Sequence, residues 1–385
     1  MQTSVAPHVV AANELTARWC AVAGAADFVV SGAGVWPLLA LLAAAAEGTA
    51  RSELETAIGV PAEAAATSAL ELLRTLADAE DVSAALGLWV RDDLPLHENW
   101  MRRLPAGTID RLGEQEVLDE WARRHTGGLI EKFPLRIEHD TVLVLATALA
   151  AKTTWEAPFT AAELAPETGP WRGRRGPGLQ RVTSRLTDAA ILEGSPPVTR
   201  VIVTGTADVD VHLLLGATTP GDVIATGLAA LTGAVPVRTD LPAGTTGPGL
   251  AVRTRTGRSR RDLLEVRLPP FEIRSAHNLC AQPELFGLTA ATDSTHGHFP
   301  DISPDPLYVA QGAQEVLARF TRTGFEAAAI TAITMARAAA LLPERLVTTI
   351  SVAFDRPFGF IAVHRPTGLA VVAGWVADPP TEPIG

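Results

Sequence analysis

The order of helical and strand-like patterns along the chain sets the strongest limit on its fold. Apolar residues recur at three- and four-residue spacing in the first third, which predicts amphipathic helices. After Thr141 the pattern changes to alternating or continuous apolar blocks, which are typical of strands. Helices followed by strands indicate an α+β fold built on large sheets, and they argue against a doubly wound α/β domain.

The elements follow from this periodicity and from the turn residues between them. The uninterrupted apolar run at 141–151 predicts a strand buried on both faces. Since we find no internal repeat and no long linker, we expect residues 1–385 to form a single domain. Predicted helices lie at 14–22, 37–46, 62–79 and 116–124, predicted strands at 84–90, 141–151, 201–215, 264–273, 347–354, 358–364 and 369–376, and predicted loops at 169–178 and 239–249.

Charge and motifs exclude several classes of function. The formal net charge of −11 repels polyanions, so a nucleic-acid partner is not expected. Nucleotide-binding glycine motifs, Cys-x-x-Cys, His-Glu-x-x-His and Gly-x-Ser-x-Gly are all missing from the sequence. The closest histidine pair, His296 and His298, needs a third ligand from elsewhere in the chain to hold a metal. We therefore expect no cofactor and no metal, and an enzyme is the less favoured interpretation because no nucleophile lies beside a recognisable base.

Two features bear on the compartment. Cys20 and Cys280 lie far apart in apolar context, which predicts free thiols and no disulfide. Residues 1–18 lack the pattern of a signal peptide, and the apolar run at 35–46 is too short for a membrane span. The sequence thus predicts a soluble cytoplasmic monomer with no membrane contact, or an extracellular protein if a leader is missing.

A basic segment stands out on this acidic chain, with five arginines in nine residues. It would attract an anionic polymer locally, or it would form a solvated loop or hairpin tip. Both interpretations stay open. The candidate anion-binding residues are Arg253, Arg255, Arg258, Arg260 and Arg261.

Residues 324–343 form the least usual stretch. Their alanine content favours a helix, yet branched residues such as Ile330 and Thr331 favour a strand. The stretch lies between two strand-like blocks, and small side chains fit between existing strands at little steric cost. We expect it to have two states, an exposed loop and a strand within a sheet.

Several sequence blocks lie on both sides of this stretch. They are LDEW (118–121), HTGGLI (125–130), TVLVLATALAAKTTW (141–155), PF (158–159), LPPFEI (268–273), DISPDPLYVA (301–310), DRPFGFIAVH (355–364) and TGLAVVAGWV (367–376). These blocks resemble the serpin family and follow the family order over nearly the whole chain. The resemblance implies an α+β serpin fold, with helices packed on three mainly antiparallel sheets and an exposed reactive-centre loop at about residues 324–345.

The resemblance also implies a function, the inhibition of serine proteases by a suicide-substrate loop that inserts into the main sheet after cleavage. An alanine at the cleaved bond suits a subtilisin-like or elastase-like protease, and Arg337 suits a trypsin-like one. By family position the hinge is Gly324, Phe325, Glu326, Ala327, Ala328 and Ala329, and the reactive bond joins Ala338 to Ala339, with Met335, Arg337 and Leu341 as alternates.

Departures from the family pattern support an alternative function. The resemblance places a sheet gate at Thr147, Trp155 and Gln314, where the family has Asn and His in place of Thr147 and Gln314. The gating hydrogen bond is therefore expected to be rearranged. Phe325 replaces the usual Thr or Ser and is predicted to slow insertion, because it would face the sheet interior. The alternative is a non-inhibitory serpin-fold protein that acts as a binding module or a small-molecule catalyst.

Overall fold

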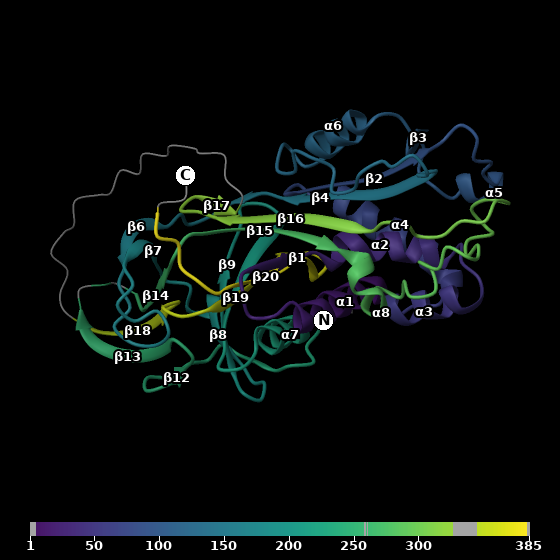
Figure 1. The fold of residues 1–385 in the computed structure, drawn as a ribbon. Helices are drawn as coiled ribbons and strands as arrows, with labels where there is room; N and C mark the ends of the chain where they lie inside the picture. The colour runs from purple at the N-terminus through teal and green to yellow at the C-terminus, as the bar shows by residue number, and fades with distance from the viewer. Residues whose placement is uncertain (1–4, 258, 260, 326–344, 383–385) are drawn as a thin grey trace.

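The computed structural model describes residues 5–257, 259, 261–325 and 345–382 (Figure 1). The basic segment is thus described only in part, and so is the predicted reactive loop. Within this part of the chain no helix has the length and apolarity needed to cross a membrane. The helices there are α1 (Pro7–Val22), α2 (Gly32–Ala43), α3 (Gly48–Ile58), α4 (Ala62–Ala77), α5 (Glu98–Met101), α6 (Gln115–His125), α7 (Pro220–Leu231) and α8 (Pro283–Phe286), with 3-10 turns at η1 (Leu186–Asp188) and η2 (Leu279–Ala281).

Two large sheets hold most of the strands that follow the N-terminal helices. In one of these sheets β18 (Arg345–Ala353) lies in the interior, because it pairs antiparallel with β13 (Leu250–Gly257) and parallel with β14 (Leu263–Leu268). One sheet has the order β1 (Phe28–Val30), β20 (Leu369–Val376), β19 (Phe358–His364), β10 (Val209–Leu215), β9 (Val198–Val203), β8 (Ala189–Leu192), β11 (Val237–Arg238). The other has the order β12 (Thr246–Gly247), β13 (Leu250–Gly257), β18 (Arg345–Ala353), β14 (Leu263–Leu268), β7 (Gly176–Thr183), β6 (Thr160–Leu164).

A third, long sheet, here called the main sheet, is divided into two hydrogen-bonded units. The units join at one end, because β5 (Thr153–Thr154) continues β4 (Leu143–Ala151) after the single residue Lys152. The serpin resemblance implied three sheets, whereas the described residues form four hydrogen-bonded sheets because the main sheet is divided. One unit has the order β15 (Phe271–Asn278), β16 (Ala313–Phe320), β17 (Gly324–Phe325), β5 (Thr153–Thr154), and the other β3 (Ile109–Arg111), β2 (Val82–Val90), β4 (Leu143–Ala151).

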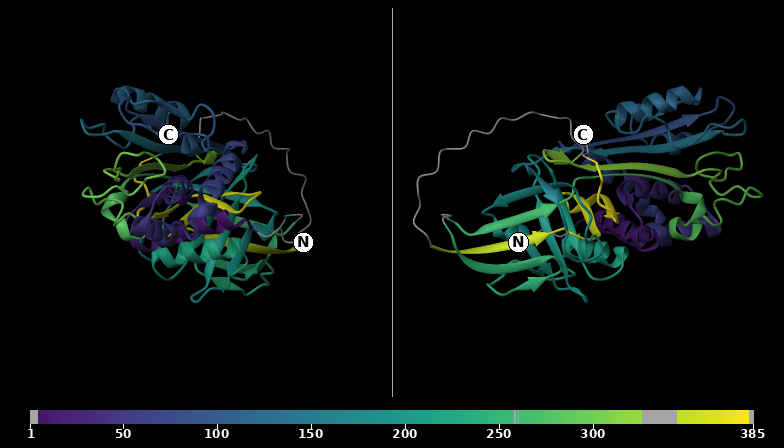
Figure 2. Two further views of the ribbon diagram at one scale, coloured as in Figure 1. Left: turned by 90° about the vertical axis from the view of Figure 1, so that its right-hand side faces the viewer. Right: turned by 60° about the vertical axis from the view of Figure 1, so that its left-hand side comes forward.

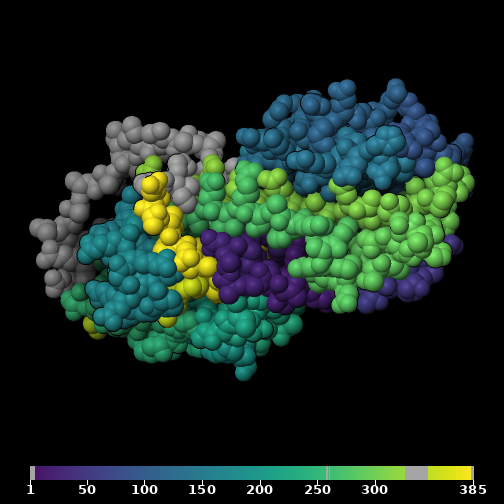
Figure 3. All heavy atoms as spheres, viewed as in Figure 1, coloured from purple at the N-terminus to yellow at the C-terminus, as the bar shows by residue number. Residues whose placement is uncertain are grey.

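The main sheet lies between two groups of helices. Helices α1 to α4 pack beneath it, and α6 covers the outer face of β2 and β4 (Figures 1 and 2). In the space-filling view the blue block that includes α6 stands beside the green band of β15 and β16 (Figure 3). Burial along β4 alternates, so the prediction of equal burial on both faces is only partly right.

Several other sequence predictions need correction. The predicted strand at 201–215 is two strands, β9 and β10, separated by a turn at Gly205. The predicted strand at 264–273 is also two, because Pro269 and Pro270 lack amide hydrogens and end β14 before β15 begins. The predicted loops at 169–178 and 239–249 contain the start of β7 and the short strand β12. Helix α2 starts at Gly32, five positions before the predicted start at Pro37.

Both cysteines are free, as predicted, but only Cys20 is buried. Burial raises the pKa of the Cys20 thiol, which keeps it protonated. Cys280 is half-buried, and burial raises the pKa of its thiol as well.

His212 gives the fold a pH dependence. Burial, with a contribution from the charge of Arg200, lowers the pKa of this β10 side chain from 6.5 to about 3. A folded-state pKa below the unfolded value means that the associated stability is complete above pH 6.5 and is lost as the pH falls toward 3. The predicted loss at pH 4 is about 3 kcal/mol of unfolding free energy. Urea unfolding at pH 7 and pH 4 measures it, and His212→Leu is expected to lack this part of the acid sensitivity; an unchanged difference would refute the assignment.

Candidate strand-insertion site

The short strand β17 lies between β16 and β5 and runs antiparallel to both. The chain reverses direction after β16 in a tight turn, in which the amide of Thr321 donates to the carbonyl of Gly324 at 2.9 Å. Phe325 then pairs with Phe320 on one side and with Thr153 on the other. The first two residues of the predicted hinge are therefore already part of the main sheet.

Each of these two residues fits its position closely. A Cβ atom on Gly324 would lie 2.4 Å from the backbone oxygen of Thr153, so only glycine permits this approach of the two strands. The side chain of Phe325 is 1% exposed, and its ring centroid lies 6.4 Å from that of Phe360. The structure accommodates Phe325 in the core at this end of the sheet, and the predicted slowing of insertion by this bulky side chain stays a prediction.

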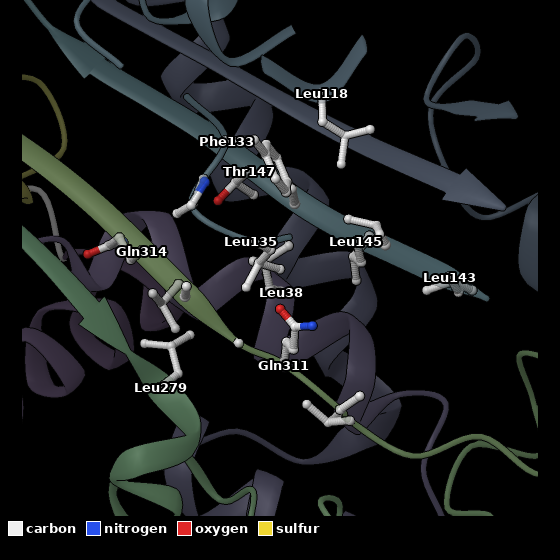
Figure 4. Close-up of a pocket in the computed structure, with 18 of the residues that line it drawn as sticks. Leu38, Leu118, Phe133, Leu135, Leu143, Leu145, Thr147, Leu279, Gln311 and Gln314 are labelled. Carbon is white, nitrogen blue, oxygen red and sulfur yellow. The ribbon is translucent and has the colours of Figure 1, made fainter. Parts of the chain in front are cut away.

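Below β17 the two units of the main sheet separate. Within the described residues β4 pairs only with β2, and β16 pairs only with β15 and β17, so the facing edges of β4 and β16 are unpaired. A cavity of about 370 Å³ lies between them (Figure 4). Its lining is largely apolar and includes Leu38, Leu135, Leu145 and Leu279. Unpaired strand edges facing a cavity form a site that fits an extended peptide.

The segment 129–142, which follows α6, covers this cavity. On the α6 side the side chain of Gln115 bonds to the backbone of Leu135 and Ile137 at 3.0 Å. On the side of β16, Gln311 donates to the carbonyl of Arg136 at 3.2 Å. A strand that fills the whole cavity must therefore displace this segment from Gln311, while its contacts with α6 need not change.

The two predicted gate residues on β4 and β16 both bind the start of α2. Thr147 donates its hydroxyl to the carbonyl of Gly34. Gln314 donates to the carbonyl of Ser31 at 2.9 Å and accepts from the amide of Ser31 at 3.0 Å. Each edge of the cavity is thus fastened to the same helix terminus.

Ser31 is a residue of the site that was not predicted from the sequence. Ser31 caps α2, because its hydroxyl accepts from the amide of Gly34 at 3.0 Å, and it donates to the carbonyl of Val371 at 2.6 Å. The sequence signal for this role is Ser31 directly before Gly32, since serine is a favoured N-cap residue.

Trp155, the third predicted gate residue, closes the top of the site beside β17. Its indole nitrogen donates to the carbonyl of Thr321 at 3.0 Å, and its ring centroid lies 4.8 Å from that of Phe320. Trp155 therefore fastens the turn that leads into β17.

Replacement of Trp155 by Phe is expected to lower the unfolding free energy by about 1–3 kcal/mol, because the buried carbonyl of Thr321 loses its donor. Chemical denaturation measures this loss. A change below about 0.5 kcal/mol, the lower end of the net contribution of one hydrogen bond, would show that this bond does not fasten the turn.

Comparison with known proteins assigns the chain to a family. The family profile described as serpin (serine protease inhibitor) matches residues 12–168 and 250–379. The chain belongs to the serpin family. Plasminogen activator inhibitor 1 of Neovison vison is 25% identical over 373 residues, which cover 92% of this chain and 87% of that protein.

Solved structures confirm the predicted serpin fold. The thermophilic serpin tengpin in its native state has a TM-score of 0.72 at 14% identity, covering 98% of this chain and 96% of tengpin. A complex of thyroxine-binding globulin with thyroxine has a TM-score of 0.70 at 14% identity, covering 97% of this chain and 98% of that one. At these identities the likeness concerns the fold alone.

The remaining predicted residues of this serpin lie on β13, in the segment that follows it, or outside the described residues. Arg253 and Arg255 are exposed on β13, so this part of the basic segment is a strand and not a loop. Arg255 pairs with Glu265 at 2.6 Å, and Arg261 is exposed. The residues outside the described part are Arg258, Arg260, Glu326, Ala327, Ala328, Ala329, Met335, Arg337, Ala338, Ala339 and Leu341.

Proposed function

We propose that this serpin inhibits serine proteases as a suicide substrate, by inserting the cleaved chain after Phe325 between β4 and β16. The observation that carries the proposal is β17 itself. It runs antiparallel to both neighbours, so continuing it in the same direction leads into the cavity between two unpaired edges. In this mechanism the protease cuts the loop and remains attached as an acyl-enzyme while the strand extends.

New backbone hydrogen bonds supply the driving force for the proposed insertion. A net backbone hydrogen bond contributes about 0.5–1.5 kcal/mol, and β4 offers nine residues as one edge of the site. Insertion along that length therefore yields on the order of 10 kcal/mol. The alanines of the hinge fit this site because their side chains are small.

The proposed partner is a serine protease, in keeping with the family description serine protease inhibitor and with the name plasminogen activator inhibitor 1 of the Neovison vison relative. A bond between Ala338 and Ala339 would select subtilisin-like or elastase-like enzymes, whereas a bond after Arg337 would select trypsin-like ones. We propose Ala338–Ala339 on the basis of family position.

Mixing the protein with one protease of each type tests the proposal. A complex that survives a denaturing gel is the expected result, and the mass of the released C-terminal peptide identifies the cleaved bond. Clean cleavage without a complex would refute inhibition by this mechanism.

The cavity supports a second candidate, the binding of a small apolar ligand by a non-inhibitory serpin. Its volume of about 370 Å³ falls within the usual range of ligand sites. The unpaired strand edges favour a peptide over such a ligand, because only a peptide satisfies their backbone groups. Saturable binding of an apolar dye, with no change after loop cleavage, would favour the second candidate.

A further inference from the structure

The edge that receives β17 is only two residues long, so something else must hold it in place. On the side away from β17, β5 contacts the turn between β9 and β10. The amide of Thr206 donates to the carbonyl of Thr154 at 2.9 Å, and the two threonine hydroxyls lie 2.8 Å apart. Trp155, the next residue, forms an antiparallel bridge with Gly205. The position of β5 therefore depends on this turn.

Gly205 is the centre of the contact. A Cβ atom on it would lie 2.2 Å from the hydroxyl of Thr153 and 2.1 Å from the carbonyl oxygen of Val209. There is no room for a side chain between the turn and β5. Any movement of the Gly205 backbone is consequently transmitted to Thr153.

One ion pair binds both polar groups of Gly205. Asp210 accepts from its amide at 3.1 Å, and Arg365 donates to its carbonyl at 3.0 Å. Arg365 also donates to both carboxylate oxygens of Asp210, at 2.9 and 2.8 Å. These bonds to Asp210 raise the pKa of Arg365, and the Asp210 side chain is only 10% exposed. Such a bidentate pair fixes the orientation of the Arg365 guanidinium relative to the Asp210 carboxylate as well as the distance between them.

We propose that Asp210 and Arg365 are positioning residues for strand insertion. They fix Gly205, Gly205 fixes β5, and β5 is the edge on which β17 forms. The inference rests on the proposed function only for the role assigned to these contacts, because the contacts themselves are present in the uncleaved protein. Arg365 follows β19, so it belongs to the part of the chain beyond the reactive loop. The pair thus ties that part to the edge that receives the hinge.

Hydrogen exchange measured by mass spectrometry tests the inference without any protease. Arg365→Ala is expected to speed amide exchange at least tenfold in β5 and β17, while exchange in β15 stays unchanged. Asp210→Asn and Arg365→Lys should show the same pattern more weakly, and they keep the test valid if Arg365→Ala fails to fold. Arg174→Ala is the matched control, because Arg174 pairs with Asp378 across the same two parts of the chain and is about as exposed as Arg365, but its carboxylate partner is 66% exposed where Asp210 is 10% exposed.

Two outcomes would overturn the inference. One is wild-type exchange in β5 and β17 of all three variants. The other is faster exchange confined to residues 204–210, which would make the pair a local brace of the turn and nothing more. A failure of the proposed inhibitory function looks different, because it removes the protease complex in the wild-type protein and leaves the exchange pattern of the variants intact.

Discussion

Cutting the chain at the proposed bond between Ala338 and Ala339 is expected to raise the thermal midpoint of this serpin by about 10–20 °C. Once the chain is cut, the part that follows Phe325 is free of β18 and can extend β17 along β4 and β16. The expected gain is on the order of 10 kcal/mol for the nine residues of β4. For a chain of this size one kcal/mol shifts the midpoint by about 1–2 °C, an extrapolation from smaller domains.

Before the cut, the same extension is opposed at the other end of the loop. β18 pairs with β13 from Arg345 to Val352 and with β14 from Thr349 to Ala353. If β18 left the sheet, both of its hydrogen-bond ladders would break, whereas the departure of an edge strand would break only one. The uncut protein is thus held with its cavity unfilled.

Differential scanning calorimetry of the intact and the cut protein, separated from the protease, measures the shift. The matched control is the same cut made in a variant that cannot form β17. Equal midpoints for intact and cut wild-type protein would contradict insertion, and the cavity would then need another occupant.

Local pattern was sufficient to predict part of this structure. The strands at 358–364 and 369–376 have the predicted bounds, since both are largely apolar runs and the turn containing Gly368 separates them. The resemblance to serpins placed Gly324 and Phe325 at the hinge, and the structure puts them at the top of the main sheet. It also assigned Trp155 and Gln314 to the sheet gate, and in the structure Trp155 directly follows β5 while Gln314 lies on β16.

The remainder depends on contacts between distant residues, which no local pattern encodes. Asp210 and Arg365 are 155 positions apart, and each is an ordinary charged residue in the sequence. Thr147 reaches Gly34 across 113 positions, so its partner is set by the packing of α2 against β4. Phe325 illustrates the same limit. Its size suggested obstruction, but only the folded structure shows that Phe360 and the core beside it leave space for the ring.

Replacing Phe325 by Glu is expected to convert the protein from an inhibitor to a substrate, with at least a tenfold fall in the fraction of cleaved molecules trapped as complex. Phe325 is 1% exposed, and a carboxylate in its place would be buried without a partner. Such a charge costs about 3–5 kcal/mol. The cost prevents β17 from forming, so insertion cannot start before the acyl-enzyme is hydrolysed.

The measurement is the number of inhibitor molecules consumed per protease molecule inhibited, read with a denaturing gel of the products. Arg322→Glu is the matched control, because it introduces the same side chain three positions away, where Arg322 is exposed. The control should trap protease as the wild-type protein does. If Phe325→Glu traps protease equally well, β17 is not where insertion begins, and the buried hinge would be a feature of the resting fold without a part in inhibition.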